Sequence, residues 1–119
     1  MRVAVTGATG LIGRRLVSSL RARGDDVTAL TRDPERARAR LSNPTQAPDS
    51  SDRSLGALET MHWDPLRESA PAAALAGRDA VVHLAGENVA QRWSASAKQA
   101  ILDSRVEGTK QLVWGLTAI

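Results

Sequence analysis

Three glycines spaced three residues apart, Gly7, Gly10 and Gly13, follow a short apolar segment near the start of the chain. This segment, Arg2–Thr6, is rich in β-branched residues and predicts a strand that is buried on both faces. In such a turn the first glycine permits the sharp reversal, the second lets a pyrophosphate approach the backbone, and the third lets a helix pack closely. The first N–H groups of that helix would face the phosphates. The alternative is a strand–helix turn without a ligand. The residues assigned to this phosphate-binding turn are Gly7, Ala8, Thr9, Gly10, Leu11, Ile12 and Gly13.

The end of the second predicted strand carries Thr31 and Arg32, where a side chain can contact the ribose of a dinucleotide. An acidic residue there would accept hydrogen bonds from the ribose 2′-hydroxyl of NAD and would repel a 2′-phosphate. A guanidinium group is instead a permanently charged donor that suits phosphate. Thr31 and Arg32 therefore predict NADP as the cofactor, with NAD less favoured. The alternative is that Arg32 is one of several surface arginines, together with Arg36, Arg38 and Arg40.

Small and polar residues follow the two later predicted strands, at the edge where ligands of open α/β sheets bind. Asp64 follows the third strand as a candidate binding residue, and the alternative is an aspartate–proline turn that caps the next segment. Leu84, Ala85 and Gly86 follow the fourth strand, where small residues let a cofactor lie against the backbone. Glu87 is predicted to line the same site.

His83 alternates with apolar residues in the fourth predicted strand, a pattern that favours a hydrogen-bonded core histidine over a catalytic base. Lys98 and Arg105 are seven residues apart on one face of the last predicted helix, from which they could contact an anionic substrate. A solvated charged face explains their spacing equally well. Because Gly108 costs about 1 kcal/mol of helix stability relative to alanine, we expect it to permit close packing against the sheet.

Apolar periodicity places these residues on alternating strands and helices. Short apolar strands alternate with helical segments, which implies a parallel sheet with right-handed crossovers. The fold class is therefore α/β, a Rossmann-type parallel sheet of about four strands with flanking helices, in the order βαβαβαβα. The predicted strands are Arg2–Thr6, Val27–Thr31, Leu58–Trp63 and Ala80–Leu84, and the predicted helices run from Leu11 to Gly24, Asp33 to Leu41, Pro71 to Ala76 and Ser94 or Ser96 to Leu116.

The apolar side of each long helix should face the sheet. In the first helix this side consists of Ile12, Leu16 and Leu20, with Val17 beside them. In the last helix it consists of Ala97, Ile101, Leu112, Val113 and Leu116.

The chain has 119 residues, which predicts one NAD(P)-binding domain over residues 1–119. Residues 42–57 are rich in Ser, Pro, Asp and Asn and predict a flexible surface insertion, because they have little apolar surface to bury. The 16 basic residues are scattered among 13 acidic ones rather than clustered with aromatic residues, which argues against a nucleic-acid partner.

The composition also argues against metal and membrane sites. With no cysteine and only two histidines, we expect no disulfide and no metal site. No apolar run approaches the roughly 20 residues that span a bilayer. Residues 1–24 contain five arginines and no acid, the composition of a presequence, but the first strand leaves no room for one. We therefore expect a cytoplasmic protein.

The segment TGATGLIG closely resembles the loop of the extended short-chain dehydrogenases/reductases, the epimerase/dehydratase superfamily. LTRDPERA, WDP, VVHLAGENVAQRW and ILDSRVEGTKQL resemble an atypical subgroup, the epimerase family proteins, whose substrate is unassigned. The resemblance covers nearly the whole chain apart from residues 42–57. It implies hydride transfer between a nicotinamide and a substrate carbon that bears a hydroxyl or carbonyl group. It also implies that Asp64 bonds the adenine amino group.

Two features of this chain depart from the superfamily. The usual Asn-Val-x-Gly-Thr of the last helix is replaced by SRVEGT, which fits the subgroup. The superfamily uses a tyrosine as its general acid/base, but this chain contains no tyrosine, so we assign no catalytic residue.

The chain ends at Ile119, where the resemblance predicts further strands and a substrate domain. We therefore expect the NADP-binding half of an oxidoreductase or epimerase-like protein, which would not catalyse alone. A small non-enzymatic NADP-binding or sensing module is one alternative, and a chain that needs a partner to complete its sheet is another. The substrate and the oligomeric state stay open.

Overall fold

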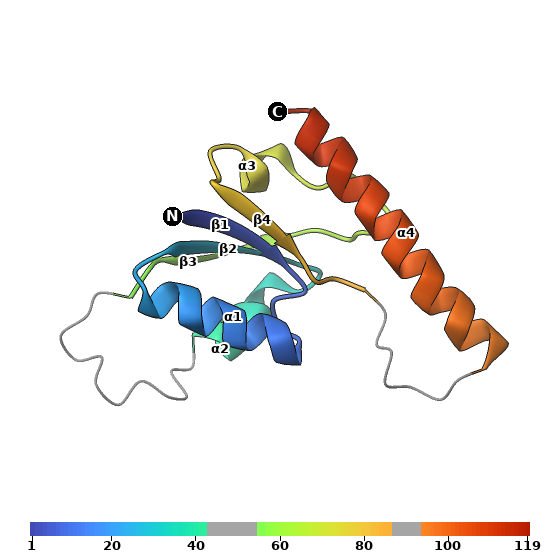
Figure 1. Cartoon of the computed structure of the whole chain (residues 1–119), viewed down its shortest axis with the longest axis horizontal. Helices are drawn as coiled ribbons and strands as arrows, with labels where there is room; N and C mark the ends of the chain where they lie inside the picture. Colours follow the sequence, from blue (N-terminus) through green and yellow to red (C-terminus); the bar gives the residue numbers. More distant parts are fainter. Residues whose placement is uncertain (43–54, 87–93) are drawn as a thin grey trace.

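A computed structural model describes residues 1–42, 55–86 and 94–119 (Figure 1). Residues 43–54, most of the predicted insertion, lie outside this description. Within the described residues, four parallel strands form one sheet in the order β3-β2-β1-β4, which confirms the α/β, Rossmann-type fold. The strands are β1 (Arg2–Thr6), β2 (Asp26–Thr31), β3 (Leu58–His62) and β4 (Ala80–His83), and the helices are α1 (Leu11–Ala22), α2 (Pro34–Leu41), α3 (Ala72–Leu75) and α4 (Ala95–Thr117).

The sheet lies between two layers of helices, with α1 and α2 on one face and α3 and α4 on the other (Figure 1). Side chains of a strand point alternately to the two faces. Val3 and Val5 of β1 accordingly belong to the same apolar cluster as Val17 of α1. Ala4 belongs to the opposite cluster, together with Leu112 of α4. β1 is therefore buried on both faces, as its apolar composition predicts.

Two strands end one residue earlier than predicted, before Trp63 and Leu84. Ladder-type hydrogen bonds nevertheless continue for that residue. The Trp63 N–H donates to the Thr31 carbonyl at 2.8 Å, and the Leu84 N–H donates to the Thr6 carbonyl at 3.1 Å. The chain therefore leaves the sheet at the edge where the predicted site residues gather.

The predicted ends of the helices are largely confirmed. The Asp33 side chain accepts a hydrogen bond from the Arg36 N–H at 3.1 Å and caps α2. Of the two serines considered for α4, Ser94 is the cap, and its hydroxyl accepts from the Ala97 N–H at 3.1 Å. Gly24 follows α1 with a φ of 90°, a conformation that favours glycine.

The predicted apolar side of α1 is wrong at Ile12, which is 71% exposed. The buried residues are Gly13, Val17 and Leu20, which share one helical face. Leu16 packs at the margin of this cluster. Because α1 begins on a glycine turn, its first close contact is made by Gly13 against the backbone of Gly7 and Ala8, and Ile12, one residue earlier, faces solvent.

The predicted apolar side of α4 is wrong at Val113, which is 47% exposed. The helix is buried instead through Ser104, Gly108, Leu112 and Gly115. A Cβ on Gly115 would clash with the Ala70 carbonyl oxygen, so the two backbones are in direct contact there. Leu112 is buried and Leu116 packs on the same cluster, so the predicted side is right there, and small residues fix the rotation of α4 that exposes Val113.

A buried carboxylate, Asp25, lies just before β2 and is bound to the start of the chain. The Met1 ammonium nitrogen is 2.8 Å from Asp25 Oδ1, and the Arg23 Nε is 3.3 Å from Asp25 Oδ2. The hydrogen bond from the Met1 ammonium lowers the pKa of the Asp25 carboxyl and raises the pKa of the ammonium. This ion pair joins the starts of β1 and β2, and its contribution to the stability of the fold therefore depends on pH.

We predict that the midpoint of thermal unfolding falls as the pH drops through the pKa of folded Asp25. A carboxyl whose pKa is lowered by folding stabilises the protein fully above its unfolded-state pKa of about 4, and this stabilisation is lost in acid. Asp25→Asn should lower the midpoint near neutral pH and flatten the decline in acid, measured by circular dichroism. The control is Glu35→Gln, which removes an exposed carboxylate. An acid decline in Asp25→Asn as steep as in the control would contradict the prediction.

Candidate functional site

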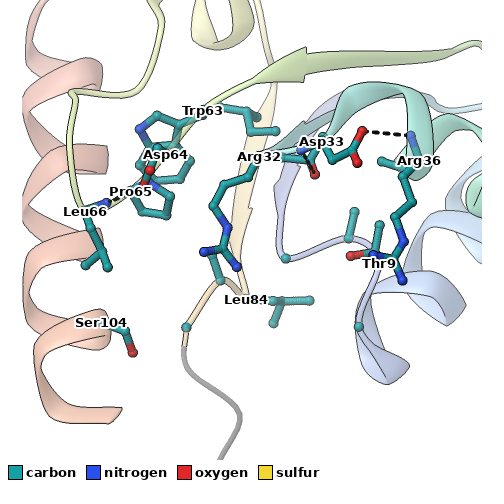
Figure 2. A pocket seen from close by; sticks show the side chains of 18 of the residues that line it. Thr9, Arg32, Asp33, Arg36, Trp63, Asp64, Pro65, Leu66, Leu84 and Ser104 are labelled. Carbon is teal, nitrogen blue, oxygen red and sulfur yellow. Dashed lines mark hydrogen bonds between the residues drawn. The ribbon is translucent and has the colours of Figure 1, made fainter. Parts of the chain in front are cut away.

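A cleft of about 450 Å³ opens at the carboxyl ends of the parallel strands (Figure 2). Its walls are the turn after β1, the segment that joins β2 to α2, the segments after β3 and β4, and one side chain of α4. The predicted site residues that line it are Gly7, Ala8, Thr9, Gly10, Thr31, Arg32, Asp64, Leu84, Ala85 and Gly86. Leu11, Ile12 and Gly13 lie in the first turn of α1 and do not line it, and Glu87 lies outside the described residues.

The three glycines of the turn have different steric roles. Gly7 has a φ of 68°, and a Cβ on it would lie 2.6 Å from the Leu84 carbonyl carbon. A Cβ on Gly13 would clash with the Gly7 carbonyl oxygen, so α1 packs directly on the turn. A Cβ on Gly10 would meet only that oxygen, at an ordinary 3.5 Å. The fold itself therefore requires glycine at positions 7 and 13. At position 10 the fold would accept a side chain, and the absence of one leaves open space in the cleft.

Within the described part of the chain, the amino end of α1 has no acidic residue in its first turn and no side-chain cap. Gly10 is the cap residue, so no side chain accepts a hydrogen bond from the first turn. The first N–H groups of a helix carry a partial positive charge and lack intrahelical partners. Together with the turn that lines the cleft, this helix end can bind an anion.

Three arginines line the cleft on the wall formed by the end of β2 and by α2: Arg32, which follows β2, and Arg36 and Arg40 of α2. Figure 2 shows the side chains of Arg32 and Arg36 pointing into the cleft. Among the described residues, none of the three forms an ion pair with a carboxylate. Asp33, next to Arg32 in sequence, also lines the cleft, and its Oδ1 caps α2 by accepting from the Arg36 N–H. Glu35, next to Arg36, is exposed to solvent. The wall can therefore bind a strongly anionic group.

Arg36 and Arg40 were not predicted as site residues. They belonged only to the alternative in which Arg32 is one of several surface arginines. Their spacing of four residues was the available signal, because it places both on one face of α2, beside the buried Ala37. Sequence alone does not show that this face borders the cleft. The complete set of lining residues that sequence analysis did not assign is Leu30, Asp33, Arg36, Ala37, Arg40, Trp63, Pro65, Leu66 and Ser104.

Asp64 forms the aspartate–proline turn that was the alternative to a binding role. Its Oδ1 accepts from the Leu66 N–H at 3.1 Å, and its Oδ2 is 3.6 Å from the Arg67 Nε. Its backbone carbonyl also accepts from the Arg67 and Glu68 N–H groups, at 3.1 and 3.2 Å. The side chain is still 23% exposed and lines the cleft, so the turn presents it rather than buries it.

The prediction that His83 is a hydrogen-bonded core histidine holds for one ring nitrogen only. Its Nδ1 is 2.7 Å from the Thr6 hydroxyl oxygen. Its Nε2 is buried without a hydrogen-bond partner among the described residues. Burial lowers the pKa of the His83 imidazole, and the nearby Arg105 guanidinium lowers it further. His83 is therefore neutral near pH 7.

Two residues of α4 reach the β4 side of the cleft. Arg105 Nη1 donates to the Ala85 carbonyl at 3.3 Å, and its guanidinium occupies the space that a Cβ on Gly86 would take. A Cβ on Gly108 would lie 3.4 Å from the Pro65 side chain and 3.9 Å from the His83 ring. Gly108 is buried, but these are ordinary contact distances, so they do not show that the packing requires a glycine there. The contact of Lys98 or Arg105 with an anionic substrate stays a prediction.

The sheet order, the glycine turn and the cleft define a Rossmann-type domain of the short-chain dehydrogenase/reductase class. The family model described as "NAD dependent epimerase/dehydratase family" matches residues 3–117. The chain therefore belongs to the NAD-dependent epimerase/dehydratase family, as its motifs indicate.

Curated relatives and solved structures agree with this assignment. The chain is 37% identical over 111 residues to epimerase family protein Mb2239 of Mycobacterium bovis, which covers 92% of this chain and 30% of that protein. The crystal structure of human epimerase family protein SDR39U1 with NADPH matches with a TM-score of 0.65 at 32% identity, over 100% of this chain and 32% of that one. MoeE5 with UDP-glucuronic acid and NAD matches with a TM-score of 0.65 at 29% identity, over 97% and 32%. The chain thus spans about a third of the length of these proteins.

Two observations on membrane and metal sites apply to the described residues only. Within them, no helix has the length and apolar character needed to cross a bilayer. They also contain no cluster of three or more histidine, cysteine or acidic side chains that could hold a metal ion.

We predict that the glycines of the turn differ in their effect on stability. Gly13→Ala forces a methyl group against the Gly7 carbonyl and should lower the free energy of unfolding by about 1–3 kcal/mol. Gly10→Ala should lower it by less, about 0.5–1 kcal/mol, because alanine is a poorer N-cap than glycine, although the φ of −70° and the surroundings of Gly10 accept a methyl group. Urea denaturation measures both. Equal destabilisation by the two variants would contradict this steric account.

Proposed function

We propose that the cleft binds the adenosine and pyrophosphate part of NADPH, with NADP(H) preferred over NAD(H). The observation that carries this proposal is the meeting of two anion-binding features in one cleft. The glycine turn lines the cleft and leads directly into the amino end of α1, and Arg32, Arg36 and Arg40 line the same cleft. A dinucleotide with a 2′-phosphate has two separate anionic groups, which suit these two features.

The residues fit this ligand part by part. The N–H groups at the start of α1 would bind the pyrophosphate, and Gly10 would give it access to the backbone. Arg32 and Arg36 would bind the 2′-phosphate by charge-assisted hydrogen bonds. Asp64 is exposed at the cleft after β3 and would accept a hydrogen bond from the adenine amino group.

The solved relatives support the ligand class. SDR39U1, at 32% identity, was crystallised with NADPH, and MoeE5, at 29% identity, with NAD. Because similar folds accept either dinucleotide, the choice depends on the side chains after β2. Here these are Thr31 and Arg32, and the one carboxylate beside them, Asp33, is committed to the cap of α2. This combination favours NADP.

In this proposal the chain supplies the cofactor-binding half of an oxidoreductase or epimerase-like protein. When bound, the dinucleotide would carry hydride to or from a substrate carbon with a hydroxyl or carbonyl group. This chain's residues would bind and orient it, but none of its 119 residues is a tyrosine that could transfer the substrate proton. We therefore propose that the chain does not catalyse alone, and that it acts in the cytoplasm without a nucleic-acid partner.

A non-enzymatic NADP-binding or sensing module is the second candidate, favoured by the same lack of tyrosine. The two differ in an activity measurement. Hydride transfer that appears only when the chain is extended with the remaining two thirds of a relative would support the cofactor-binding half. Tight, reversible NADPH binding by a stable monomer, with no activity on such extension, would support the sensing module.

We predict that Arg32→Asp weakens NADPH binding by about 1–3 kcal/mol, the range for a hydrogen bond to a charged group. NADH binding should change less, because NADH has no 2′-phosphate. Isothermal titration calorimetry measures both. The matched control is Arg38→Asp, which removes an exposed arginine of α2 that does not line the cleft. Equal affinity of Arg32→Asp and Arg38→Asp for NADPH would show that Arg32 does not contact the phosphate.

We also predict that Gly10→Ala separates binding from folding. Its methyl group is tolerated by the chain but would occupy the space through which the pyrophosphate approaches the backbone. NADPH and NADH affinity should both fall at least about tenfold, while the variant still unfolds cooperatively and loses only the cap preference of about 0.5–1 kcal/mol. Unaltered affinity in the folded variant would show that the pyrophosphate does not bind at the glycine turn.

A further inference from the structure

The Thr6 hydroxyl lies at the junction of β1 and β4, directly beneath the cleft. Thr6 is fully buried. Its Oγ1 is 2.7 Å from His83 Nδ1, 3.0 Å from the Leu84 nitrogen and 3.1 Å from the Ala85 nitrogen. One side chain therefore bonds three consecutive residues that are more than seventy positions away in sequence.

Counting protons fixes the direction of each bond. A hydroxyl group has one proton to donate and two lone pairs to accept with. The backbone N–H groups of Leu84 and Ala85 are donors, so both lone pairs of Thr6 Oγ1 are used. The hydroxyl proton must then go to His83 Nδ1, which accepts it only if that nitrogen carries no proton. This assignment makes His83 neutral with its proton on Nε2, a buried nitrogen that has no hydrogen-bond partner among the described residues.

The Ala85 N–H depends on the Thr6 hydroxyl for its acceptor more than the Leu84 N–H does. The Leu84 N–H is shared with the Thr6 carbonyl oxygen at 3.1 Å, as in a continuing strand ladder. Thr6 Oγ1 is the acceptor that the structure gives the Ala85 N–H, while the Ala85 carbonyl accepts from Arg105. Gly7 packs on this same segment, since a Cβ there would lie 2.7 Å from the Ala85 nitrogen.

We propose that Thr6 and a neutral, Nε2-protonated His83 form a positioning pair that holds residues 84–86 as a wall of the cleft. Neither side chain lines the cleft, so the pair acts through Leu84, Ala85 and Gly86, which do. Its effect on cofactor affinity rests on the proposed function, whereas the tautomer of His83 does not. Protonating His83 would put a third donor against Thr6 Oγ1 and displace one of the backbone N–H groups. Cofactor affinity should therefore fall in acid.

The surroundings of His83 oppose its protonation. Trp63 lies beside the ring, with the ring centres 6.3 Å apart, and carries no charge. From α4, Gly108 packs at the ring edge, and Arg105 is the charged group that acts on His83. Burial and this cation lower the pKa of His83 below its ordinary value of 6.5. The neutral form that the junction requires is thus the form that the surroundings favour near pH 7.

The first test needs no cofactor. Long-range proton–nitrogen NMR correlation on the ¹⁵N-labelled chain reports which imidazole nitrogen carries the proton. The chain has only two histidines, so His62→Asn leaves His83 alone in the spectrum. We expect a protonated Nε2 and an unprotonated Nδ1 near pH 7. A proton on Nδ1, or a charged ring, would overturn the pair.

The second test compares conservative and disruptive variants by calorimetric titration with NADPH, with folding checked by circular dichroism. Thr6→Val and His83→Leu should weaken NADPH binding about tenfold, the usual effect of one lost hydrogen bond. Thr6→Ser keeps the hydroxyl, and His83→Asn keeps an acceptor at the δ1 position. Both should bind within about threefold of the original chain, by the same reasoning on a retained bond.

The dependence of dinucleotide affinity on pH distinguishes the positioning role from a merely structural role of the pair. The profile is measured with NADH, because the 2′-phosphate of NADPH itself takes up a proton near a pKa of about 6 and would bind the arginines less well in acid. Affinity of the original chain for NADH should fall in acid, and His62→Asn should keep this fall. His83→Asn should remove it, because an amide does not titrate in this range. Folded Thr6→Val with unchanged affinity, or a fall in acid that persists in His83→Asn, would overturn the positioning role. If the original chain bound no NADPH at all, the proposed function would fail while the NMR result still judged the pair.

Discussion

The cleft depends on one close approach, in which the turn after β1 lies backbone to backbone against the segment after β4. Gly7 reaches this contact only because its φ is positive and it has no Cβ to collide with Leu84. Gly13 brings α1 onto the same turn, so the amino end of the helix is aimed at the cleft. Thr6, the residue before Gly7, accepts hydrogen bonds from the Leu84 and Ala85 N–H groups in the segment after β4. Removing the space at Gly7 would separate the two walls and displace the helix end with them.

The fold and the position of the site followed from local patterns. Short β-branched strands that alternate with helical segments determine a parallel sheet, and the carboxyl edge of such a sheet gathers the residues that follow each strand. Gly7, Arg32 and Asp64 could therefore be placed on one cleft without any contact information. The cap at Asp33 was equally local, since it depends on a side chain and an N–H three residues apart.

What sequence reasoning missed depends on contacts between distant elements. The α4 helix is oriented by backbone contact at Gly115, where hydrophobicity gives no signal, so Val113 was placed on the wrong face. Arg36 lines the cleft because α2 turns one particular face toward it, which spacing alone does not specify. The Thr6–His83 bond joins residues 77 positions apart and depends on the register of β1 against β4.

The most direct test of the account is calorimetric titration of the purified chain with NADPH and, in parallel, with NADH. The account predicts saturable binding of both, with NADPH bound more tightly and with that preference reduced at higher salt, because it rests on charge. Equal affinity for the two dinucleotides would contradict the role of the arginine wall. No binding of either, by a sample that unfolds cooperatively, would contradict the cofactor site itself and leave the glycine turn as architecture.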